Sequence, residues 1–67
     1  MLDQAIIEKA LLETMQKYKD FPITRGVLLD IKRDVVATLI ELHPDNGKMT
    51  EREVSRALTQ LSGIDLN

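Results

Sequence analysis

His43 is the only imidazole in the chain, and it stands directly before Pro44, where a helix is expected to end. The chain has no cysteine, and eight of its 11 aspartate and glutamate residues are scattered over the predicted helices, with basic residues nearby. Nucleophilic catalysis needs a nucleophile, a base and an orienting acid within hydrogen-bond reach, and no segment gathers such residues. We therefore predict a protein that is not an enzyme and that uses no cofactor and no metal ion.

The segment DNGKMTERE, residues 45–53, has the spacing of the second half of a calcium loop. With Gly47 at the sixth position, Glu53 falls at the twelfth, and this half resembles the EF-hand family. The first and third ligand positions then fall on Leu42 and Pro44, whose side chains carry no oxygen. Because half of the coordination shell is missing, we expect the segment not to bind calcium.

A second resemblance covers Thr50 to Gly63, where the pattern T-x-x-E-V-x-x-x-L is followed by a glycine. This pattern resembles the first helix and turn of helix-turn-helix repressors. Only residues 64–67 follow Gly63, so this helix itself would have to read the DNA, supported by the helix before it. Its outward face supplies the candidate contacts to a partner or to DNA, which are Lys48, Arg52, Ser55, Arg56 and Thr59.

The overall charge argues against nucleic acid as the main partner. The net charge is −2 and the isoelectric point is about 5.2, whereas a DNA-binding domain is usually basic. No stretch approaches the roughly 18 apolar residues of a membrane span, and the first residues lack the basic leader of a signal peptide. We expect a cytoplasmic protein.

Apolar residues recur at helical spacing in three segments, which predicts an all-α fold. The helices are expected at about 3–19, 24–43 and 50–62, within one helical domain that spans residues 1–67. Because 67 residues form a small core, which rarely supplies more than about 3–5 kcal/mol, we also expect a homodimer.

The ends of the third helix are predicted from its capping residues. Thr50 is the expected N-cap, and Glu53 three residues on completes a capping box. Gly63 suits the left-handed C′ position, with Ile64 folding back on Leu58 as in a Schellman motif. The expected buried residues of this helix are Val54, Ala57, Leu58 and Leu61.

The middle helix carries two apolar stripes and is therefore placed at the centre of a compact three-helix fold. One stripe consists of Leu28, Ile31, Val35, Leu39 and Leu42. The second stripe, Leu29, Val36 and Ile40, is the candidate dimer interface.

These features predict a small protein-protein interaction module that self-associates and acts as a regulator, adaptor or inhibitor. Its partners are expected to be a second copy of itself and another protein, without a role for a membrane. The alternative is a small helix-turn-helix-like transcriptional regulator that binds DNA through the outer face of the third helix.

Overall fold

The protein is represented by a computed structural model, which describes residues 4–42 and 47–66, without the side chains of residues 47–49. The described residues form three helices and no strand: α1, Gln4–Lys17; α2, Arg25–Leu42; and α3, Gly47–Ser62. The predicted all-α, three-helix fold is confirmed, and each helix lies within three residues of its predicted bounds.

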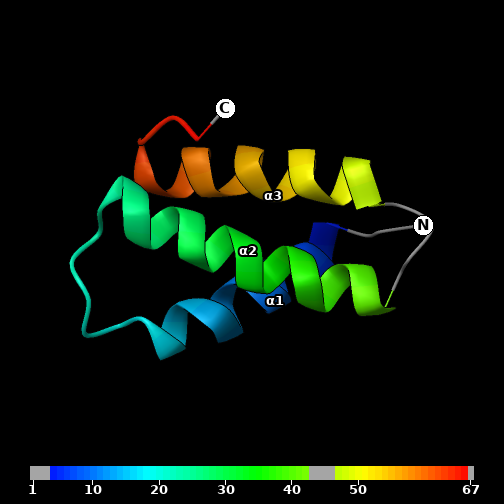
Figure 1. Ribbon diagram of the computed structural model, residues 1–67, viewed down its shortest axis with the longest axis horizontal. Helices are drawn as coiled ribbons and strands as arrows, with labels where there is room; N and C mark the ends of the chain where they lie inside the picture. The colour runs from blue at the N-terminus through cyan, green and yellow to red at the C-terminus, as the bar shows by residue number, and fades with distance from the viewer. Residues whose placement is uncertain (1–3, 43–46, 67) are drawn as a thin grey trace.

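Helix α2 lies at the centre of the fold, as predicted. It contacts both α1 and α3 extensively, whereas α1 and α3 contact each other much less (Figure 1). Four residues of its first stripe are buried, but Leu42 at the end of the helix is 65 % exposed. The buried apolar core consists of Ile7, Leu11, Leu28, Ile31, Val35, Leu39, Val54, Leu58 and Leu66.

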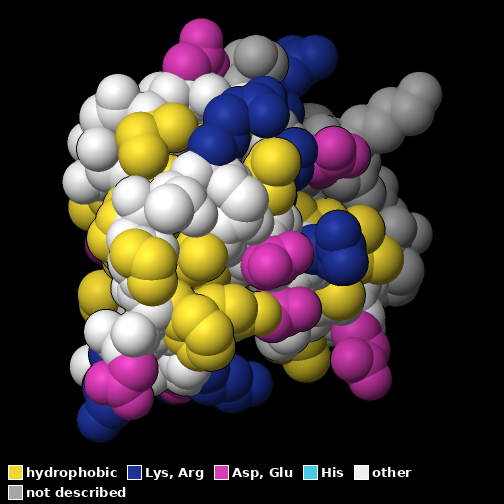
Figure 2. Space-filling model, turned by 60° about the vertical axis from the view of Figure 1, so that its left-hand side comes forward, with side chains coloured by type: hydrophobic (Ala, Val, Ile, Leu, Met, Phe, Trp, Pro, Cys, Tyr) yellow, Lys and Arg dark blue, Asp and Glu magenta, His cyan; other side chains and the backbone are white. Residues whose placement is uncertain are grey.

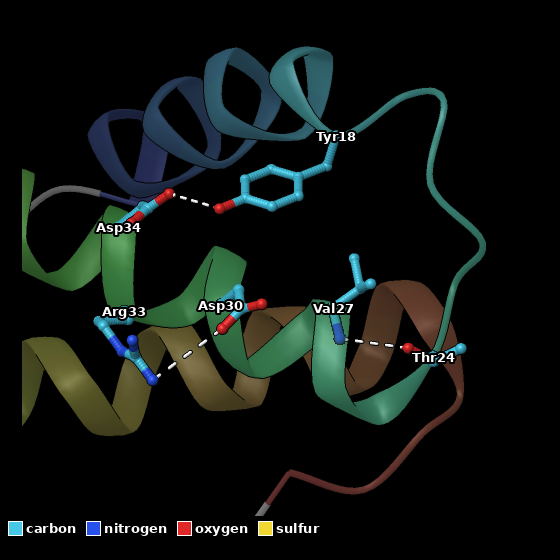
Figure 3. Close-up of polar contacts among 6 residues, drawn as sticks. All are labelled: Tyr18, Thr24, Val27, Asp30, Arg33 and Asp34. Atoms are coloured by element: carbon cyan, nitrogen blue, oxygen red, sulfur yellow. Dashed lines mark hydrogen bonds and ion pairs between the residues drawn. The ribbon is translucent and has the colours of Figure 1, made fainter.

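The facing ends of α1 and α2 have specific hydrogen bonds. Helix α1 ends at Lys17 because the next turn tightens: the Tyr18 amide donates to the Met15 carbonyl oxygen at 3.1 Å, an i to i−3 bond. At the start of α2, the Thr24 Oγ1 accepts the Val27 amide at 3.2 Å (Figure 3). Thr24 is therefore the N-cap of α2.

Helix α3 begins at Gly47, three residues before its predicted start. Thr50 consequently lies inside the helix with its side chain fully buried, so its predicted role as N-cap is wrong. The carboxylate of Glu53 lies 3.8 Å from the guanidinium of Arg56, one turn further along. The capping box is wrong for the same reason, since its N-cap position is occupied by a helical residue.

The C-terminal end of α3 uses a glycine cap of a simpler kind than predicted. Gly63 has a φ of 74°, in the left-handed region, and its amide donates to the Thr59 carbonyl oxygen at 2.8 Å. The Ile64 amide donates instead to Ser62 Oγ at 3.1 Å. This is the single-bond αL cap, and the predicted Schellman motif is wrong because Ser62 takes the amide that the motif requires.

Residues 63–66, here called the C-terminal tail, turn back over α3 (Figure 1). The Leu66 amide donates to Thr59 Oγ1 at 3.2 Å, and Arg25 Nε of α2 donates to the Asp65 carbonyl oxygen at 3.5 Å. The side chain of Leu66 is 5 % exposed and belongs to the core. The tail thus connects the last turn of α3 to the first turn of α2.

Tyr18 links α1 to α2 through its hydroxyl group, which donates to Asp34 Oδ2 at 2.8 Å (Figure 3). This hydrogen bond to Asp34 raises the pKa of the Tyr18 hydroxyl, because ionisation would remove the donated proton. Partial desolvation and the negative charges of Asp34 and Asp30 raise the pKa further, while Arg33 opposes them.

The raised pKa predicts a loss of stability in alkaline solution. Because the folded-state pKa lies above the unfolded value of about 10, the contribution of Tyr18 is complete below pH ~10 and is lost as the pH rises through the folded value. The unfolding free energy of the wild type should therefore fall more steeply above pH ~10 than that of Tyr18→Phe. In Asp34→Asn, phenolate absorbance should titrate at a lower pH than in the wild type. Identical titrations would contradict this role of Asp34.

Candidate protein-interaction surfaces

An open groove runs between α2 and α3 and has a volume of about 510 Å³. We call it the α2–α3 groove. Its apolar lining comes from α2, and its charged lining comes from both helices because the two run side by side (Figure 1). It is lined by Leu29, Lys32, Arg33, Val36, Ala37 and Glu51.

Ion pairs set the charge of this groove. Lys32 Nζ lies 3.3 Å from Glu51 Oε1, and its side chain is only 18 % exposed. A lysine can cover apolar surface with its long stem while its amine reaches a partner or water. Arg33 is 80 % exposed and lies 3.9 Å from Asp30, a long contact between exposed groups that contributes little stability (Figure 3). Arg33 is thus the cation of the lining that is most available to a ligand.

Two of the three residues of the predicted dimer interface line this groove. Leu29 and Val36 are half-buried and line the α2–α3 groove. Ile40 is also half-buried but does not line it. Along the groove, this stripe is bordered by the charged side chains of Lys32, Arg33 and Glu51.

A second surface lies between α1 and α3, and we call it the apolar face. Leu12 and Leu61 are 64 % and 63 % exposed and line the same hollow of about 320 Å³, with Leu11 and Ala57 in its lining. An adjacent hollow of about 150 Å³ shares Leu61 and is also lined by Ile23, which is 55 % exposed. The two hollows make these three large side chains part of one continuous surface.

The end of the molecule that carries the α1–α2 loop also exposes apolar groups. With that end turned toward the viewer, hydrophobic side chains reach the surface in several places (Figure 2). In the loop, Phe21 is 55 % exposed, and its ring centroid lies 5.7 Å from that of Tyr18. Exposed apolar side chains are therefore present both on the apolar face and in the adjoining α1–α2 loop, which contributes Ile23 and Phe21.

The outward face predicted for the third helix is only partly present. Arg52 and Arg56 are exposed, but Ser55 is 3 % exposed, and its predicted position on the outward face is wrong. Thr59 is half-buried, and its hydroxyl is engaged by the C-terminal tail. The side chain of Lys48 lies outside the described residues. The structure thus brings two of the five candidate residues together in solvent.

The arrangement of α2 and α3 bears on the helix-turn-helix alternative. The two helices run side by side in opposite directions, and residues 43–46 separate them in the sequence (Figure 1). A DNA-reading helix-turn-helix instead sets its two helices at a steep angle of about 90–120°, so that the second helix can enter the major groove. The antiparallel hairpin gives no support to DNA reading by α3.

Within residues 4–42 and 47–66, no three histidine, aspartate or glutamate side chains lie close enough together to hold a metal ion. In the same residues, every buried side-chain nitrogen and oxygen has a hydrogen-bond partner. None of the described helices is both long enough and apolar enough to cross a membrane. His43, residues 45–46 of the calcium-like segment and the side chains of residues 47–49 lie outside the part of the chain that the structure describes.

Sequence reasoning placed Leu61 in the core, whereas the structure places it on the apolar face. The spacing of α3 is compatible with burial of this residue, and only the limited contact between α1 and α3 leaves it exposed. For Leu12 the sequence carries one signal, which is an apolar residue on α1 directly after the buried Leu11.

Comparison with known proteins identified no matching family model, no similar curated protein and no similar solved structure.

Proposed function

We propose that this chain is a non-catalytic protein-interaction module that pairs with a second copy of itself through the apolar face. The observation that carries the proposal is the exposure of Leu12 and Leu61, at 64 % and 63 %, on two helices that flank one hollow. Covering each of these leucines would contribute about 1–2 kcal/mol, because full burial of a leucine is worth roughly 1.5–3 kcal/mol.

A second copy suits this face better than a highly charged partner. In a two-fold symmetric dimer the same patch meets itself, so like charges near the axis would repel. Glu8 is the one charged residue in the lining of the larger hollow, and Gln4 and Gln60 are neutral. Two projecting leucines beside a hollow also form a self-complementary shape, since a leucine of one copy can enter the hollow of the other.

Sedimentation at micromolar to millimolar protein concentration tests the proposal. The wild type should show twice the 7.6 kDa chain mass and dissociate on dilution. Leu61→Glu should weaken pairing by roughly 30-fold or more, because each dimer loses the contact twice. A monomeric wild type at millimolar concentration would reject the proposal.

Val36→Glu is the matched control, since it puts the same charge into the α2–α3 groove. We expect this variant to remain dimeric. If Val36→Glu separates the copies and Leu61→Glu does not, the interface is instead the stripe of Leu29, Val36 and Ile40.

A further inference from the structure

The residues of α2 and α3 that hold the C-terminal tail stand in line, along each helix, with residues that line the α2–α3 groove. Such a line of residues on one helix face is called a row below. Residues three or four apart share one face of a helix. On α2, such a row begins at the tail contact and continues into the groove lining, through Arg25, Leu29, Lys32 and Val36. On α3, the equivalent row runs from the tail contact Thr59 through Ser55 to the groove residue Glu51. The residues that hold the tail and the residues that line the groove therefore lie on the same face of α2 and on the same face of α3.

The bound tail shows which kind of segment these rows accept. Its backbone is held by side chains: the Leu66 amide by Thr59 Oγ1 and the Asp65 carbonyl by Arg25 Nε. Its aliphatic Leu66 side chain is buried in the core to 5 % exposure. A short non-helical segment with an aliphatic side chain is thus already bound at one end of the rows.

The open part of the groove offers comparable chemistry. Leu29, Val36 and Ala37 supply apolar surface, and Arg33 supplies a cation that is 80 % exposed. The seven residue-to-residue steps from Leu29 to Val36 rise about 10 Å along the helix, which matches the length of about three extended residues.

We propose that the α2–α3 groove binds a short extended segment of a partner protein, about three residues long, with an aliphatic side chain in the groove and an acidic side chain on Arg33. Glu51 is paired with Lys32 at 3.3 Å, so the cation left for an acidic side chain is Arg33, which is 80 % exposed and only 3.9 Å from the exposed Asp30. This site lies on a different surface from the apolar face and does not depend on self-association.

A peptide titration of the full chain tests the site. The probe is a synthetic hexapeptide with the sequence of residues 62–67, SGIDLN, which carries the aliphatic and acidic side chains of the tail. Added to ¹⁵N-labelled protein, it should produce saturable amide shifts at Leu29, Val36 and Glu51. A peptide with alanine in place of its leucine should produce none.

Matched arginine variants separate the proposed contact from general charge attraction. Arg33→Glu should weaken the peptide at least tenfold. Arg56→Glu should leave binding within twofold, although Arg56 is also exposed and also pairs weakly with an acid three residues earlier, at 3.8 Å. Circular dichroism should show that both variants remain folded.

Four results would overturn the proposal. The first is the absence of any saturable amide shift at millimolar peptide, and the second is an equal loss of peptide affinity in both arginine variants. The third is a set of amide shifts confined to Leu66 and Thr59. The fourth is the appearance of shifts at Leu29 and Val36 when the protein is concentrated without peptide. The third result would mean that the peptide only displaces the tail. The fourth would mean that a second copy occupies the groove.

Discussion

Leu39→Ala is expected to unfold most of the protein at room temperature. Leu39 is fully buried in the last turn of α2, and truncating a buried leucine to alanine costs about 2–5 kcal/mol. The core of so small a domain rarely supplies more than about 3–5 kcal/mol, so the loss is comparable to the whole stability. Urea titration followed by circular dichroism should show a wild-type transition and, in the variant, a transition shifted close to zero urea.

Leu42→Ala is the control for this prediction, because Leu42 is the same residue type on the same helix but is 65 % exposed. Its urea midpoint should stay near that of the wild type. Both proteins must be compared at equal concentration, since self-association adds to the apparent stability. A midpoint for Leu39→Ala within error of the Leu42→Ala value would show that the core does not centre on α2.

The second large effect is expected for Leu66→Ala, in the C-terminal tail. Leu66 is 5 % exposed within the core, so its truncation should cost about 2–5 kcal/mol, although it lies in no helix. Losing the buried side chain also releases the segment that connects α3 to α2. The variant should unfold at markedly lower urea than Leu42→Ala.

Thr59→Val separates the hydrogen bond of the tail from its hydrophobic contact. This substitution keeps the side-chain shape but removes the Oγ1 that accepts the Leu66 amide at 3.2 Å. The amide of Leu66 should then exchange with solvent faster, while the urea midpoint falls less than in Leu66→Ala. Unchanged exchange at Leu66 would mean that the tail is held by its side chain alone.

The central helix was the most predictable part of the molecule. Its 18 residues carry a long periodic apolar pattern, and four of the five residues in the predicted first stripe are buried. Thr24 was also predictable, since an N-cap is a local interaction between residues close in sequence. The predicted burial of Leu42 was wrong, because periodicity indicates which side of the helix a residue faces but not whether a neighbouring helix extends far enough to cover it.

Helix α3 shows where local signals were overruled by packing. The T-x-x-E pattern at Thr50 has a capping-box spacing, yet the helix begins at Gly47 and buries Thr50 completely. Ser55 is buried too, although a serine within one helical turn of Arg52 and Arg56 indicates a solvated face. The burial of both small polar side chains depends on long-range packing, which sequence spacing does not encode.

The candidate surfaces were less predictable than the core. Leu29 and Val36 were singled out as apolar positions beyond the main stripe, and the structure places both in the lining of the α2–α3 groove. The burial of Leu66 was not foreseen, because an isolated leucine after a glycine cap has no periodic pattern around it. The apolar face arises from the limited contact between α1 and α3, a property of tertiary packing.

The link between Tyr18 and Asp34 also fixes how the molecule can be observed optically. The chain contains one tyrosine and no tryptophan, so its intrinsic fluorescence comes from Tyr18. A carboxylate that accepts the phenolic proton quenches tyrosine emission, and Asp34 Oδ2 lies 2.8 Å from that hydroxyl. The folded protein should therefore be dim, and any event that separates the end of α1 from α2 should brighten it. The protein carries a built-in optical reporter for this one helix junction and requires no attached dye.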